Sequence, residues 1–262
     1  MRNTVRTELL LVAGRSWVVF AGMLSLVVPR LVYADSILDL VAKSTVPWEK
    51  YKEKHGVAVE RRAVKGSSFY EYRAVSTMPM APAALIELMW STVPTRTGPV
   101  VRKRQVLQKS KDSLLIYDQI KTPVVSDRDY TMRLRTQALG NDRYEMTFQT
   151  ANDEGPPLDP HYVRIPAISG RWLVEPEPGK DGFSHVTYQT YSEPGGSVPA
   201  FMISGPQFEQ VIRSIENLAA HIKSEQATQA GSPGTSGQQA QPPHTEHGEL
   251  PQPIRNPPPP PT

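Results

Sequence analysis

An amphipathic stretch near the C-terminal end places the strongest constraint on the fold. Between Phe208 and Ile222, apolar residues recur at steps of three and four, which places them on one side of an α-helix. These residues are Phe208, Val211, Ile212, Ile215, Leu218, Ala219 and Ile222. We expect the helix to begin at Gly205-Pro206, because proline fits the first helical turn, where its missing N–H costs nothing. The apolar side must be covered, either by an ordinary core or by the other wall of a ligand cavity.

The chain before this helix is dominated by strand-like segments joined by short polar turns. They span residues 57–64, 69–76, 100–109, 113–121, 128–138, 143–151, 163–168, 170–174 and 184–191. Helical spacing is expected at 35–46 and 82–90, and a further turn or two of helix at 48–55. Consecutive antiparallel strands with helices at both ends predict an α+β fold, in which one curved sheet wraps around the long C-terminal helix.

Two adjacent predicted strands place aromatic and sulfur-containing side chains on one face. These are Tyr130, Met132 and Leu134 on one strand and Tyr144, Met146 and Phe148 on the next, and polar residues alternate with them. Such a face forms either core or ligand wall. Residues 152–161 form a long irregular loop, a kind of segment that often serves as a functional lid.

Composition limits the domain count and the chemistry. Ten of the 26 prolines lie after position 230, so we expect one domain followed by a disordered tail at 226–262 with polyproline character near its end. The tail is either simply solvated or a ligand for a protein partner. A net charge of +3, without a basic run interleaved with aromatics, argues against nucleic acid. The absence of cysteine excludes disulfides, thiolate nucleophiles and zinc–thiolate sites.

The N-terminal segment predicts export. Three arginines precede an apolar run at 17–28, and Val32-Tyr33-Ala34 supplies small residues at the positions before a cut. We therefore predict a signal peptide at 1–34 and a periplasmic or secreted protein. The alternative is an uncleaved membrane anchor, although the run is shorter than the roughly 20 residues that a span needs.

Several short motifs, in order, resemble the START (steroidogenic acute regulatory protein-related lipid transfer) domain family. They are Ser126-Asp127-Arg128-Asp129-Tyr130, Tyr162-Val163-Arg164-Ile165, Gly170-Arg171-Trp172, and the stretch from Ser192 to Phe201. The match in order and spacing runs from about Trp48 to Ile222, and we place the START-like lipid-binding domain at 35–225.

The resemblance implies a helix-grip fold with a tunnel for one lipid, such as a sterol or phospholipid, that is carried between membranes without chemistry. It implies no cofactor or metal, a monomer, and transient contact with a membrane surface. The tunnel wall would be Asp118, Tyr130, Met132, Leu134, Tyr144, Met146, Phe148, Tyr188, Phe208, Val211, Ile212 and Ile215. Residues 152–161 would be a mobile loop at the tunnel mouth.

Some members of this family bury an acid and an arginine on neighbouring strands inside the tunnel. Here the acid position falls on Asp118, but the arginine position is Leu134. An acid without a cation in an apolar tunnel would have a raised pKa, because desolvation disfavours the charged form. The alternative is that Asp118 meets solvent or a base such as Arg104. We expect Arg128 and Asp129 to be structural.

The competing interpretation is an enzyme, a cyclase or hydrolase acting on a pocket-bound ligand, with His185 and Tyr188 facing the cavity. The sequence has no G-x-S-x-G, H-E-x-x-H or glycine-rich phosphate loop. His244 and His247 fall in the predicted tail, where a solvated pair is expected rather than a metal site. A third interpretation is a tethered scaffold. We favour the non-catalytic lipid carrier.

Overall fold

The computed structural model describes residues 37–95, 98, 100–122 and 125–231. The chain divides into two units, Met1–Ile222 and Lys223–Thr262, and the fold considered below is that of the first. The predicted signal peptide at 1–34 lies outside the described residues, as does the part of the predicted tail after residue 231.

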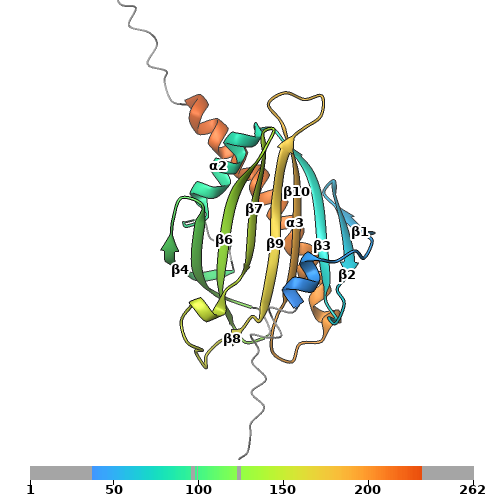
Figure 1. Cartoon of the computed structure of the whole chain (residues 1–262), viewed down its shortest axis with the longest axis vertical. Helices are drawn as coiled ribbons and strands as arrows, with labels where there is room; N and C mark the ends of the chain where they lie inside the picture. The colour runs from blue at the N-terminus through green and yellow to red at the C-terminus, as the bar shows by residue number, and fades with distance from the viewer. Residues whose placement is uncertain (1–36, 96–97, 99, 123–124, 232–262) are drawn as a thin grey trace, which may run out of the picture. The chain divides into compact units, whose positions relative to one another are not determined.

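One curved sheet organises the described part of the chain (Figure 1). Its ten strands are β1 Glu49–Lys54, β2 Val57–Ala63, β3 Tyr70–Met78, β4 Val101–Lys109, β5 Ser113–Ile120, β6 Arg128–Gly140, β7 Arg143–Thr150, β8 Val163–Arg164, β9 Ala167–Pro176 and β10 Ser184–Glu193. The strand order is β1-β2-β3-β10-β9-β7-β6-β5-β4, with antiparallel pairing along the whole path. The short β8 pairs with β6 in parallel. The predicted α+β class with a curved antiparallel sheet is therefore confirmed.

The helices α2, Pro82–Thr92, and α3, Ala200–Gly231, pack on one face of this sheet, and the helical residues 37–42 pack on the other. A short 3-10 turn, η1, spans Asn152–Glu154. In Figure 1, α3 lies behind the strands, while the helical residues 37–42 lie in front of them. We call the face toward α3 the inner face and the opposite face the outer face.

The inner face and α3 share one apolar core. Alternate residues of the strands, the inward side of α2 and the predicted stripe of α3 are buried together in it. Its fully or nearly fully buried members include Val59, Tyr72, Leu85, Leu114, Ile116, Val174, Val186, Val211, Ile212 and Ile222. The apolar stripe that constrained the sequence analysis is thus covered by the sheet.

α3 is longer than predicted at both ends. It begins at Ala200, so Pro206 lies inside the helix rather than in its first turn. Proline in that place removes the hydrogen bond to the carbonyl of Met202, four residues earlier, and its ring crowds that carbonyl, but the turn that precedes it still forms. The helix continues to Gly231, so the predicted start of the tail at 226 is wrong for residues 226–231.

The segment 48–55 is a strand and not the predicted helical turn. β1 and β2 form a hairpin through His55 and Gly56, which both have positive φ, 50° and 77°. Two consecutive residues with positive φ make the tight turn that suits the twist of antiparallel strands. The sequence reading took Gly56 for the end of a helix, although glycine serves equally in such a turn.

Candidate functional site

The predicted wall residues meet on the inner face as expected from strand alternation. Leu134, Met146, Phe148, Tyr188, Phe208, Val211, Ile212 and Ile215 are all buried in the shared core, and Met132 and Tyr144 are partly buried against it. The remaining two, Asp118 and Tyr130, contact each other on β5 and β6. Each predicted residue therefore lies on or beside one apolar lining between the sheet and α3.

Trp172, which was not among the predicted wall residues, joins Tyr188 and Phe148, which were, in an aromatic group on this lining. Trp172 on β9 stacks on Tyr188, its cross-strand partner on β10, with ring centroids 4.1 Å apart. Phe148 lies 6.3 Å from Tyr188 on the other side. Burial raises the pKa of the Tyr188 hydroxyl, while interactions with Thr190 and Ser214 oppose that shift. The register of two adjacent strands would have revealed Trp172, but register is not visible in a single segment.

Gly170 allows the Phe148 ring to lie against the sheet. A Cβ atom at Gly170 would come within 2.3 Å of Phe148 Cζ and 2.2 Å of the Gln189 carbonyl oxygen. Gly170 on β9 and Phe148 on β7 are cross-strand partners. The absence of a side chain at Gly170, in the Gly170-Arg171-Trp172 motif, thus determines how closely the Phe148 ring packs against the sheet.

A polar group interrupts the apolar lining at Asp118, whose side chain is fully buried. Arg104, its cross-strand partner on β4, donates from Nε to Oδ1 at 2.8 Å and from Nη2 to Oδ2 at 2.5 Å. The Tyr130 hydroxyl donates to Oδ2 at 2.9 Å. Burial, and then the neighbouring Asp118 carboxylate, raise the pKa of Tyr130 far above its usual range. We call these three residues the polar trio.

The polar trio corrects the expectation of an unpaired acid. Leu134, at the position where some family members have arginine, lies opposite Leu114 on β5 and Phe148 on β7. The cation that pairs with Asp118 comes instead from β4, the other neighbour of β5. Arg104 also donates from Nη1 to the carbonyl of Val93, the residue after α2, at 2.7 Å. The alternative that named Arg104 as the partner is the correct one, and a buried charge is thereby compensated.

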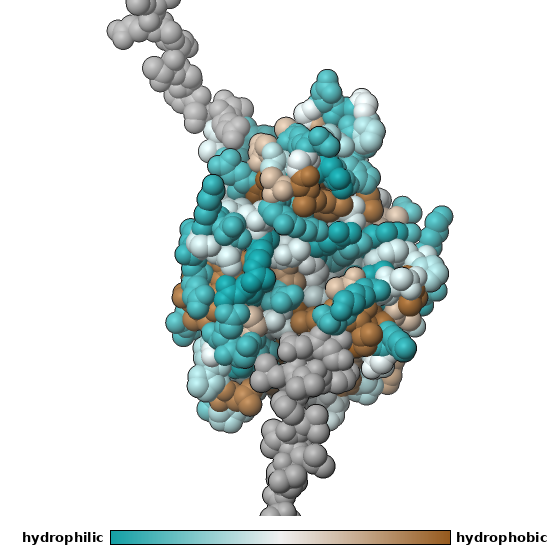
Figure 2. Space-filling model, viewed as in Figure 1, coloured by the Kyte–Doolittle hydropathy of each residue, from teal (hydrophilic) through white to brown (hydrophobic). Residues whose placement is uncertain are grey.

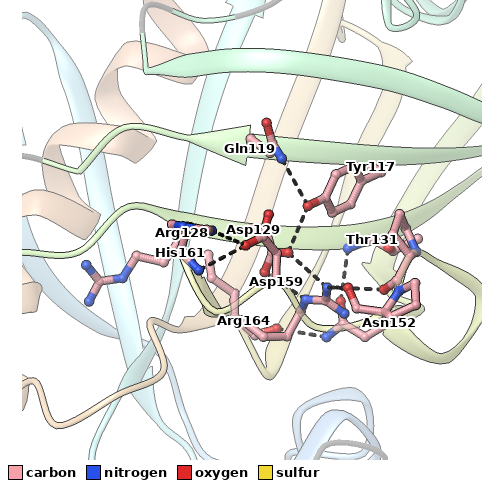
Figure 3. A network of polar contacts seen from close by, with 12 residues as sticks. Tyr117, Gln119, Arg128, Asp129, Thr131, Asn152, Asp159, His161 and Arg164 are labelled. Carbon is pink, nitrogen blue, oxygen red and sulfur yellow. Dashed lines mark hydrogen bonds and ion pairs between the residues drawn. The ribbon is translucent and has the colours of Figure 1, made fainter.

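A second buried network lies on the outer face, around Asp129 (Figure 3). Arg164 on β8 donates to both carboxylate oxygens of Asp129, at 2.7 and 2.9 Å, and the Tyr117 hydroxyl donates at 2.9 Å. Arg128 donates to the backbone carbonyls of Ser126 and Pro194. Both Arg128 and Asp129 therefore bond to protein groups, in agreement with the structural role expected for them.

The same network fixes part of the loop that was expected to be mobile. Arg164 donates to the carbonyls of Pro156 and Pro157, each at 3.2 Å. Asn152 accepts from the Thr131 amide at 2.9 Å and donates to the Ile165 carbonyl at 2.8 Å. Asn152, Pro156 and Pro157 are thus hydrogen-bonded to the outer face.

Two cavities are lined by described residues, and neither is lined by the α3 residues predicted for the tunnel wall, Phe208, Val211, Ile212 and Ile215. One, of about 510 Å³, lies on the outer face beside residues 37–48 and includes Phe148 among its lining residues. The other, of about 110 Å³, lies between residues 68–70 and the first turns of α3. The inner lining itself consists of side chains packed together, so a guest there must displace part of that packing.

The histidine named in the enzyme interpretation lies away from the inner lining. His185 lies on the outer face, with Nδ1 3.3 Å from Glu177, so the expectation that it faces the interior with Tyr188 is wrong. Within the described ranges there is no group of three His, Cys, Asp or Glu residues able to hold a metal ion. No helix in the same ranges has the length and apolarity required to span a membrane.

Comparison with known proteins identifies the fold. No family model matches the chain. An uncharacterized protein of Pseudomonas aeruginosa is 25% identical over 174 residues, which cover 65% of this chain and 84% of that protein. A crystal structure of a STAR-related lipid transfer protein from Xanthomonas axonopodis is 24% identical, with a TM-score of 0.60 over 67% of this chain and 98% of that one. Human StAR-related lipid transfer protein 5 has the same TM-score at 14% identity, over 75% and 98% of the two chains. The chain therefore has the helix-grip fold of the START-type lipid transfer domains.

Proposed function

We propose that this protein binds one lipid between the inner face of the sheet and α3 and carries it between membranes without altering it. The observation that carries the proposal is the composition of the lining, which is mainly apolar and contains the polar trio as a buried charged group. Each methylene that leaves water contributes about 0.8 kcal/mol, so an apolar guest is retained without directed chemistry. The fold shared with lipid transfer proteins supports the same assignment.

The polar trio supplies the contact for the polar end of the lipid. A lipid hydroxyl or carbonyl oxygen can exchange hydrogen bonds with Arg104 and Tyr130, whose donors lie beside a fully buried carboxylate. A few polar groups in an apolar site fix the orientation of the ligand, while shape selects its size. A sterol or another lipid with a compact polar end fits this arrangement best.

Loading requires α3 to separate from the sheet, because the inner side chains are packed together. Two side-chain contacts hold α3 to the β1–β2 hairpin, the Lys54–Glu209 ion pair at 2.7 Å and the hydrogen bond between His55 Nδ1 and Glu216 Oε1 at 2.5 Å. These pairs are partly exposed, so each contributes little to stability and can break without a large cost. Gly195 and Gly196, both with positive φ, precede α3 and give the backbone freedom for this movement.

Lipid extraction from vesicles tests the proposal. Full-length protein is incubated with phosphatidylcholine–cholesterol vesicles, separated by size, and the lipid that elutes with it is identified by mass spectrometry. We expect up to one lipid per chain, with its mass unchanged, and return of that lipid to acceptor vesicles. Lipid of altered mass would favour the enzyme, and no bound lipid from vesicles of sterol, phospholipid or whole-cell extract would refute the carrier.

Matched variants on α3 assign the binding to the lining. Ile212 is 1% exposed in the core, and Ile212→Asp should abolish loading. Because this change also strains folding, Ile212→Phe provides a second variant that fills space without adding charge. Ala220→Asp introduces the same carboxylate on the exposed side of α3 and should load normally. If a folded Ile212→Phe protein loads lipid normally, and Ile212→Asp also shows no loss of loading, then α3 does not form part of the wall of the lipid site.

We further propose that residues 1–34 direct export and are removed. Mass spectrometry of the protein recovered from its host should then show an N-terminus at Asp35 in a periplasmic or secreted fraction. A chain that retains Met1 and sediments with membranes would instead indicate the anchored alternative.

A further inference from the structure

The cavity of about 510 Å³ on the outer face is separate from the proposed lipid site. Its floor is built from outward-pointing side chains of β3, β10, β9 and β7, and its wall from residues 38–48. Figure 2, drawn from the same side as Figure 1, shows mainly hydrophilic residues on this face with apolar patches between them. The volume lies in the range of small-molecule sites. The two sides of one sheet therefore offer chemically different sites.

The wall of this cavity is held in a fixed position. Ile37 and Val41 of the helical residues 37–42 are buried against Tyr191 and Ala167 on the outer face. Arg62 donates to the Ser44 carbonyl at 2.8 Å and the Val41 carbonyl at 3.2 Å, where it binds the carbonyl end of the helix. Side-chain donors at this end of a helix satisfy carbonyls that have no partner within it.

An indole completes the wall. The guanidinium groups of Arg62 and Arg73 each lie 4.5 Å from the centre of the Trp48 ring. Contacts of this kind between a cation and an aromatic face are attractive and restrict the side chains involved. Together with Leu38 and Val41, the Trp48 ring gives the cavity an apolar side.

Hydrogen-bond donors gather on the floor. Gln189 on β10 pairs in register with Arg73 on one side and with Arg171 on the other, so the two arginines stand two strands, or about 10 Å, apart. Arg171 uses Nε to bond Gln189 and Nη1 to bond Glu145. Its Nη2 and the Gln189 amide nitrogen have no hydrogen-bond partner among the described residues.

Ser169 adds an unsatisfied group to the same floor. Its hydroxyl oxygen is buried and has no hydrogen-bond partner among the described residues. A buried polar group without a partner costs free energy, so its persistence suggests that a ligand or water completes it. Ser169 precedes Arg171 by two positions on β9, so both side chains project from the same face of the strand.

The one carboxylate that lines the cavity is already neutralised. Glu71 is 4% exposed and accepts a hydrogen bond from Arg62 Nε at 2.5 Å. Burial raises the pKa of Glu71, while Arg62 opposes that shift. Arg73 pairs in turn with Glu60 and Arg171 with Glu145, so the cavity offers an anion the remaining N–H donors of Arg171 and the Gln189 amide rather than an unpaired cation.

We propose that this outer cavity binds a small organic anion, whose phosphate or carboxylate group contacts Arg171, Gln189 and Ser169 and whose apolar body lies against Trp48. The donors supply charge-assisted hydrogen bonds to the anion, and the indole side excludes water from the rest of the ligand. The proposal does not depend on lipid binding at the inner face.

Titration of the full-length protein with 1-naphthyl phosphate, followed by ¹H–¹⁵N NMR, tests this site. We expect saturable shifts at Ser169, Arg171, Gln189 and the Trp48 indole, and an affinity that falls as NaCl rises. Arg171→Met should weaken binding by about tenfold or more, the loss expected for one charged hydrogen bond. Arg143→Met is the matched control, because Arg143 also pairs with a glutamate, Glu175, but does not line the cavity.

Three results would overturn the proposal. The first is an equal loss of affinity for 1-naphthyl phosphate in Arg171→Met and Arg143→Met. The second is binding of neutral 1-naphthol as tight as that of the phosphate. The third is a set of NMR chemical-shift changes confined to residues of the inner face and α3, such as Tyr188 and Ile212. Competition by inorganic phosphate, compared with co-sedimentation on vesicles that contain phosphatidic acid, then distinguishes a soluble anion from a lipid headgroup as its source. An effect of Arg171→Met in either assay supports the site.

Discussion

Replacing Arg104 by methionine should be among the most destabilising single changes in the domain. The change leaves the Asp118 carboxylate, which is fully buried, without its cation, while Tyr130 alone still donates to it. Removing one partner of a buried ion pair costs about 3–5 kcal/mol, because the remaining charge stays out of water. The Arg104 side chain is itself only 12% exposed, so the variant also recovers the cost of desolvating the guanidinium, and this gain offsets part of the loss.

Removing the whole polar trio should cost less than removing Arg104 alone. In Arg104→Met/Asp118→Leu/Tyr130→Phe, no buried charge or hydroxyl is left without a partner, and apolar groups of similar size take the place of the trio. Such replacements are often neutral or stabilising for buried ion pairs. We therefore expect the wild type and the triple variant each to have a free energy of unfolding about 2 kcal/mol or more above that of Arg104→Met.

Urea denaturation followed by tryptophan fluorescence measures this order, provided that the m values agree among the variants. Arg143→Met is again the control, because Arg143 and Glu175 are 45% and 27% exposed, and a pair of that kind contributes at most about 1 kcal/mol. The reasoning is refuted if Arg104→Met costs no more than this control, or if the triple variant is less stable than Arg104→Met.

Three further predictions concern other parts of the inner face. Burial raises the pKa of Tyr72 to about 12, above the value near 10 of an unfolded chain, so stability should fall as pH rises from about 10 to 12, by up to about 2.7 kcal/mol, and Tyr72→Phe should lessen the fall in pH-dependent urea titrations. Gly170→Ala should lower stability by about 1–3 kcal/mol, because its Cβ meets the Phe148 ring; an unchanged denaturation midpoint would show that the ring moves freely. Glu209→Gln/Glu216→Gln should speed lipid loading in stopped-flow transfer assays with little change in Tm, and an unchanged rate would mean that these ion pairs do not limit the opening of α3.

The amino-acid sequence predicts the sheet and the last helix well, because both have strong periodic patterns. The stripe from Phe208 to Ile222 and the alternation on β6 and β7 depend on local spacing alone. The structure buries the stripe except Ala219, which is exposed, and buries or partly buries the predicted residues of the two strands. The β1 strand was missed because Gly56 ends a helix and closes a hairpin equally well. The early start of α3 was missed because Pro206 is a typical first-turn residue, and only contacts distant in sequence show that the helix begins before it.

The polar features could be predicted only in part. Asp118 was recognised as an acid inside the lining, but its partner was settled by the register of β4 against β5, which includes irregularities that no local pattern reveals. The outer cavity was not predicted, because it combines Trp48 with residues from five strands, β2, β3, β7, β9 and β10. Cross-strand neighbours of Gln189 become visible only when the order of β3, β10 and β9 is known.

The bond from Arg104 to the Val93 carbonyl has a mechanical consequence. One guanidinium grips both the buried carboxylate and the last turn of the neighbouring helix, at 2.5 and 2.7 Å. A ligand whose polar end moves Arg104 away from Asp118 or from the Val93 carbonyl would also weaken the hydrogen bond to the other partner. Binding of a ligand on the inner face would then weaken the attachment of the C-terminal end of α2 to β4, the last strand of the sheet.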